Sequence, residues 1–140
     1  MDIKKYLYCF IFPALFSGLI AVPVTFYMTV NYEKERVVAE YKLDTFKGVA
    51  GYRYIFNKPN SSGNDKFVSS MNQVPFAFGD SPLVIEKHEE YYKIRSNKSF
   101  GAQANNDAFI KLVYAMMDDL EIPRKSIGDN TLEKVFTIGN

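Results

Sequence analysis

Residues 107–120 read DAFIKLVYAMMDDL, and this stretch has the strongest amphipathic pattern in the chain. Its apolar residues recur at spacings of three and four, the period that places side chains on one face of an α-helix. They are Phe109, Ile110, Leu112, Val113, Met116, Met117 and Leu120. Asn106 is a suitable N-cap, and Pro123 follows the predicted end. The stretch therefore predicts a helix with one buried face, as in a small helical bundle.

Three other helices are predicted before it. A long helix covers residues 32–55 and can continue from the apolar segment that precedes it. A short helix over residues 65–74 is expected to end at Pro75. The next helix begins at Pro82, directly after the N-cap Ser81. Loops are predicted at residues 57–64 and 96–105.

The apolar face of residues 107–120 needs a partner, because it is too apolar to remain in water. We expect it to pack against the long helix, since two amphipathic helices bury their faces against each other. The predicted face residues are Phe109, Val113, Met116 and Leu120, opposite Leu43, Phe46 and Ala50. Gly48 and Gly51 would allow a neighbouring helix to approach closely.

Residues 6–30 read YLYCFIFPALFSGLIAVPVTFYMTV and contain no charged side chain. About 20 apolar residues cross the hydrocarbon core of a bilayer, so this run predicts a membrane anchor. The alternative is a cleaved signal peptide. The run is longer than a usual signal-peptide core, and no clear cleavage site follows it, so an uncleaved anchor is favoured.

The predicted fold class is mainly α: an N-terminal transmembrane helix plus a small helical bundle. A short extended C-terminal tail is an option, because residues 131–138 (TLEKVFTI) alternate. The predicted parts are a head and transmembrane helix, 1–31, and a soluble helical domain, 32–140. Positive residues follow the anchor in greater number than they precede it, which favours a single-pass inner-membrane protein with a cytoplasmic domain over the opposite orientation. They are Lys34, Arg36, Lys42 and Lys47 after the anchor, against Lys4 and Lys5 before it.

Composition argues against several classes of function. The formal net charge is +1 and no basic face stands out, so nucleic acid is not an expected partner. Cys9 is the single cysteine and lies in the predicted anchor, which excludes a disulfide or a cysteine zinc site within the domain. The expected partners are the lipid bilayer and another protein, and the transmembrane helix offers a route to oligomers. No cofactor is predicted.

Two groups of residues resemble chemical sites. His88, the only histidine, lies in the run EKHEE at residues 86–90. Neighbouring residues on a helix point in different directions, so a solvated charged face is the favoured interpretation. Asp118, Asp119 and Glu121 have the composition of a magnesium site at a helix end. The chain lacks the common nucleotide-binding and hydrolase motifs, so an enzyme is not the favoured reading, and no catalytic or metal residue is predicted.

Three segments carry a family resemblance: LDTFKGVAGYR (43–53), FVSSMNQVPFAFGD (67–80) and FIKLVYAMMDDLEI (109–122). Their order resembles an uncharacterised bacterial family, domain of unknown function 6680. The resemblance covers nearly the whole chain and implies a membrane-tethered helical domain without a known activity. The chain departs from the family at residues 48–51, where the family has larger residues, and near the C-terminus.

Arg53, Asn72 and Asp80 are the polar residues that coincide with the family segments, so the resemblance makes them candidate ligand contacts. Their structural interpretation is that they satisfy backbone groups at helix ends.

The favoured function is a membrane-tethered interaction or regulatory module. Its expected setting is a bacterial or phage-encoded defence or exclusion system. One alternative is a membrane sensor that binds a ligand between its helices. The other is a small metal-dependent enzyme that uses Asp118, Asp119 or His88. A pocket with convergent polar groups would favour the sensor, and a metal-dependent activity would favour the enzyme.

Overall fold

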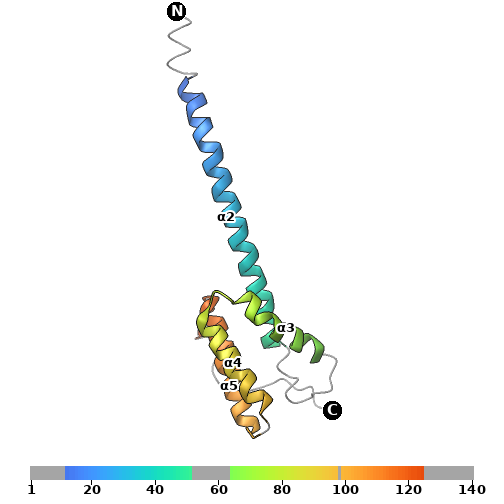
Figure 1. Cartoon of the computed structure of the whole chain (residues 1–140). Helices are drawn as coiled ribbons and strands as arrows, with labels where there is room; N and C mark the ends of the chain where they lie inside the picture. The colour runs from blue at the N-terminus through green and yellow to red at the C-terminus, as the bar shows by residue number, and fades with distance from the viewer. Residues whose placement is uncertain (1–11, 52–63, 98, 125–140) are drawn as a thin grey trace, which may run out of the picture. The chain divides into compact units, whose positions relative to one another are not determined.

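The computed structural model describes residues 12–51, 64–97 and 99–124 (Figure 1). These residues form helices and no strand. The helices are α2 (Phe12–Gly51), α3 (Asn64–Ala77), α4 (Pro82–Ser96) and α5 (Ala102–Asp119). The mainly helical prediction is confirmed, while the predicted tail at residues 131–138 lies outside the described residues. The chain divides into two compact units, residues 1–38 and 39–140, which are described separately.

The first unit contains the beginning of α2. Every residue from 16 to 29 is exposed, and this stretch carries no charge. Phe16, Leu19 and Phe26 are 62%, 71% and 70% exposed. No helix in the described part of the chain is long and apolar enough to span a bilayer. The start of the predicted anchor, residues 6–11, lies outside the described residues.

The second unit has its core around α5, which lies side by side with α4 (Figure 1). The core cluster consists of Val49, Phe67, Met71, Val74, Ala77, Phe78, Val84, Tyr91, Ala108, Phe109, Leu112, Val113, Ala115, Met116 and Met117. About half of these residues come from α5, so the predicted amphipathic face is confirmed. Leu120 is partly buried against the cluster.

The prediction that this face of α5 packs against the long helix is wrong in part. α5 packs mainly on α4, and the last turns of α2 contribute fewer residues. On α2 the buried positions are Lys42, Thr45 and Val49, whereas Leu43 is 36% exposed. Two of these buried side chains are polar. The search for apolar spacing therefore predicted a buried face of α2 that is shifted by about one residue from the observed face. The Thr45 hydroxyl donates to the Tyr41 carbonyl at 2.9 Å, which explains how it is accommodated.

Close approach of α2 and α3 occurs at Gly48. A Cβ atom there would overlap the side chain of Ser70, 2.8 Å from its Cβ. Among the residues that the structure describes, none lies within 4 Å of a Cβ atom built at Gly51. The glycine prediction is therefore confirmed at the first position, and the described residues give it no support at the second.

Two helix boundaries differ from the predictions. α3 continues through Pro75 to Ala77, and α5 begins at Ala102 rather than Asp107. Residues 102–106 lack the apolar period, but alanine and glutamine favour a helix. Ser81 and Pro82 are confirmed as the N-cap and first residue of α4.

The C-terminus of α5 closes with a left-handed residue. Glu121 has φ 55°, and its amide donates to the Asp118 carbonyl at 3.1 Å. The Ile122 amide donates to the Met117 carbonyl at 2.8 Å. This pair of bonds is a Schellman motif, in which glycine is the usual left-handed residue.

Candidate functional site

A cleft of about 320 Å³ lies between α3 and α4. The lining positions recur at spacings of three and four along each helix, so they lie on one face of α3 and one face of α4. From α3 they are Asn64, Phe67, Val68, Met71, Asn72 and Pro75, and from α4 His88, Tyr91, Tyr92 and Arg95. Its volume falls in the range of small-molecule sites.

The cleft has an apolar floor and a polar rim. Phe67, Met71 and Tyr91 are buried and belong to the hydrophobic core. Asn72 and Arg95 are exposed at the rim. Such an arrangement suits a ligand with an apolar body and a few polar groups, since apolar walls supply affinity and polar groups supply orientation.

His88 joins the two helices at one end of the cleft. Pro75 has no amide hydrogen, so the carbonyl of Met71, four residues earlier in α3, loses its usual helical donor. His88 Nε2 lies 3.0 Å from that carbonyl oxygen. Because a carbonyl can only accept, Nε2 carries the hydrogen and donates it. α4 thereby supplies the donor that Pro75 removes from α3.

The electrostatics favour neutral His88. Burial lowers the pKa of its imidazole below the ordinary value and outweighs the opposing hydrogen bond to Met71. With the hydrogen on Nε2, the neutral ring keeps Nδ1 as an acceptor. The favoured sequence interpretation, a solvated face, is therefore wrong for His88, which is half-buried in the cleft.

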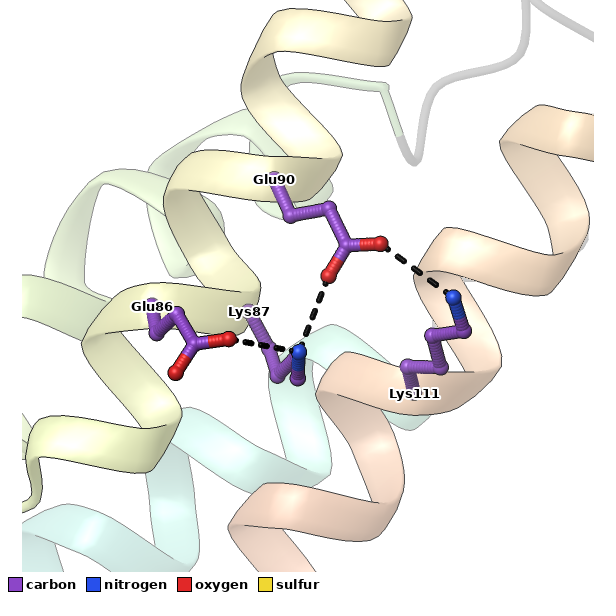
Figure 2. Close-up of polar contacts among 4 residues, drawn as sticks. All are labelled: Glu86, Lys87, Glu90 and Lys111. Carbon is purple, nitrogen blue, oxygen red and sulfur yellow. Dashed lines mark hydrogen bonds and ion pairs between the residues drawn. The ribbon is translucent and has the colours of Figure 1, made fainter.

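The charged residues beside His88 fit the predicted solvated face better than His88 itself does (Figure 2). Lys87 Nζ contacts Glu86 at 2.7 Å and Glu90 at 3.1 Å, and Lys111 of α5 contacts the other oxygen of Glu90 at 3.2 Å. Glu90 thus links α4 to α5 on their outer side. The hydrogen bonds to both lysines hold the pKa of Glu90 below its ordinary value.

A second polar cluster lies around Lys42, which is buried in α2. Its Nζ is 2.8 Å from Asp80, in the turn between α3 and α4, and 2.9 Å from Asp119, at the end of α5. The same ammonium lies 5.5 Å from the ring centre of Phe78. Burial by itself lowers the pKa of Lys42, but the bonds to both aspartates outweigh it and raise the pKa. Lys42 therefore links α2 to the turn between α3 and α4 and to the end of α5.

The structure separates the sequence-predicted site residues. Asn72 lies on the cleft, Asp80 is bound to Lys42, and Arg53 lies outside the described residues. The hydrogen bond from Lys42 lowers the pKa of Asp80. A structural role is thus the better description of Asp80, whereas Asn72 remains a candidate ligand contact.

The acidic group at the end of α5 is also dispersed. Asp118 is paired with Arg124, Asp119 with Lys42, and Glu121 forms the left-handed cap. Within the described ranges, no three histidine or acidic side chains are placed to hold a metal ion.

Sequence reasoning missed Lys42 and the role of Pro75. A lysine at a helix position that keeps the period of the buried face was one available signal. A proline inside an otherwise periodic stretch, with one histidine in the next helix, was the other.

No family model, curated protein or solved structure matches this chain. The resemblance to domain of unknown function 6680 therefore stays a prediction.

Proposed function

We propose that this chain is a membrane-tethered module whose helical domain recruits or regulates another protein. The observation that supports the tether is the uncharged stretch at residues 16–29 of α2, in which every residue is exposed. A helix that is apolar on all sides needs an apolar surrounding, because exposed apolar area is unfavourable in water. A bilayer provides that surrounding, and residues 6–15 extend the uncharged run.

Alkaline carbonate extraction of cell membranes tests the tether. The wild-type chain is expected in the membrane pellet. A variant with Ile20→Asp and Val24→Asp should move to the soluble fraction, because charges are costly in hydrocarbon. Val37→Asp is the matched control: its position is also exposed but lies beyond the uncharged run. Recovery of the wild type in the soluble fraction would refute the tether.

Exposed aromatic side chains support contact with a protein partner. Phe76 is 80% exposed and Tyr92 is 67% exposed, and aromatic residues are enriched where proteins bind one another. A partner recovered with the wild-type chain from detergent-solubilised membranes should be lost with Phe76→Ser. Val68→Ser, on the same helix, is the control for a nonspecific loss of apolar surface. Equal recovery of the partner with the wild-type, Phe76→Ser and Val68→Ser chains would contradict a role of Phe76 in partner binding. The setting in a defence or exclusion system stays a prediction.

The cleft between α3 and α4 favours a second candidate, a sensor that binds a small ligand. Its convergent residues are polar at the rim and apolar at the floor, as a ligand site requires. The two candidates are compatible, since a ligand in the cleft could alter the partner surface that contains Tyr92. Neither depends on metal chemistry.

A further inference from the structure

We infer that the last turns of α2, residues 42–51, form a strap that opens by itself while α4 and α5 stay packed, and that Lys42 is the latch that holds the strap closed. These residues all belong to the second unit of the chain. The inference describes a conformational device within the domain. It goes beyond the proposed functions and depends on neither the tether nor the sensor candidate.

The strap buries little apolar area on the domain. Among the described residues, Val49 is its single member of the core cluster, and Phe46 is partly buried against that cluster. Thr45 is buried but bonds to the Tyr41 carbonyl of its own helix, and Gly48 has no side chain to bury. Segments with few buried apolar side chains open at a lower free energy than the core of a protein. The closed position of the strap therefore depends on a specific contact.

Lys42 supplies that contact. Its ammonium lies 2.8 Å from Asp80, in the turn before α4, and 2.9 Å from Asp119, at the end of α5. The side chains of Lys42 and Asp119 are 11% and 16% exposed, so this ion pair is largely shielded from water. Desolvation offsets much of the attraction in a shielded ion pair, but the loss of one partner is strongly destabilising. The pair therefore fixes the closed position without making it as stable as the core.

The position of Asp119 supports the latch. It is the last residue of α5, where the partial negative charge of the helix end makes a further negative charge unfavourable. Asp118 and Glu121 add negative charge to the same helix end. Asp118 is paired with Arg124, and Asp119 is paired with Lys42. The negative charge at this end of α5 thus attracts the ammonium of an open strap back to its closed position.

The test measures how fast a buried cysteine reacts with a thiol reagent in the full-length chain in detergent. Cys9, the single native cysteine, is first replaced by serine. Thr45→Cys then reports on the strap, and Ala108→Cys reports on the core within α5. Where reclosing is faster than labelling, each rate is proportional to the population of the open state. The Thr45→Cys chain should react on the order of tenfold faster and with a weaker urea dependence, because strap opening exposes less surface than global unfolding.

Lys42→Met tests the latch. It should speed the labelling of the Thr45→Cys chain about tenfold or more, because the closed strap then buries the Asp119 carboxylate without its partner. Adding Asp119→Asn removes the charge of that carboxylate and should slow the labelling again. Lys47→Met is the matched control, because Lys47 is an exposed lysine of the same segment that pairs with Asp44 of α2 itself. It should leave the labelling rate unchanged.

Two results would overturn the inference. Equal rates and equal urea dependence for the Thr45→Cys and Ala108→Cys chains would mean that the strap leaves the domain only when the whole domain unfolds. Equal labelling rates after Lys42→Met and Lys47→Met would mean that Lys42 is not the latch. Val49→Cys is a second reporter in case Thr45→Cys disturbs the fold, since Val49 is also buried on the strap, and it should react at a similar rate.

Discussion

Replacing His88 with alanine should destabilise the second unit because the Met71 carbonyl would lose its donor. A buried carbonyl left without a partner costs about 1–3 kcal/mol. The cleft is open at its rim, so water can reach this carbonyl in part, and we expect about 1.5 kcal/mol, in the lower half of that range. For a domain of this size, 1 kcal/mol corresponds to a change in melting temperature of about 4–8 °C.

Combining His88→Ala with Pro75→Ala tests whether the lost donor explains this destabilisation. Alanine at position 75 restores an amide hydrogen four residues after Met71, so the helix can satisfy the carbonyl by itself. His88→Ala should then be about 1 kcal/mol less destabilising in the Pro75→Ala chain than in the wild type. The interaction energy from this double-mutant cycle isolates the contact from other effects of losing the imidazole.

The assay is thermal unfolding of the full-length chain in detergent, followed by the near-ultraviolet circular dichroism of its tyrosines. Glu89→Ala is the control, because Glu89 is exposed on the same helix. The pH dependence of the stability provides a second test. Since the folded-state pKa of His88 is lowered, the unfolded chain takes up the proton first, and wild-type stability should fall as pH drops below about 6.5. Strictly additive single-variant effects would refute the proposed role of His88.

Four further predictions concern stability and use the same melting assay. Lys42→Met should destabilise the domain by about 2 kcal/mol, because the largely buried carboxylate of Asp119 loses its partner. Asp80→Asn should cost below about 1 kcal/mol, since Asp80 is mostly exposed. Equal destabilisation by the two substitutions would contradict this difference. The contribution of Asp80 should be present above about pH 4 and vanish as pH falls through its lowered pKa, and a pH-independent difference between wild type and Asp80→Asn would argue against it. Glu121→Gly should raise stability by about 1 kcal/mol by relieving the left-handed conformation, and a loss would refute the cap assignment. Val113→Asp should destabilise by several kcal/mol, against less than about 1 kcal/mol for exposed Lys111→Ala, and similar melting temperatures would contradict the burial of Val113.

The sequence predicted the elements whose apolar period is uninterrupted. In α5 the spacing from Phe109 to Met117 identifies the buried face, because core burial selects apolar side chains at the helical period. The first turns of α5 were missed for the complementary reason: residues 102–106 carry no such period and are helical through local propensity. Periodicity thus reports burial rather than helix length.

The candidate site could not be predicted from the same signal. Lys42 and His88 occupy inward positions as polar residues, so a search for apolar spacing passes over them. Each is accommodated by a partner distant in the sequence, Asp119 for Lys42 and the Met71 carbonyl for His88. Local sequence contains no direct record of such pairs, since they form only when the helices meet.

Pro75 connects the stability of the bundle with the proposed ligand site. By removing one amide hydrogen from α3, it leaves an acceptor to which His88 of α4 donates, and the bond fixes Nε2 as the ring nitrogen that carries the hydrogen. In the Pro75→Ala chain the imidazole would be released from this task, and either nitrogen could carry the hydrogen. The missing backbone donor in α3 and the tautomer of the imidazole that lines the cleft are consequences of the same residue.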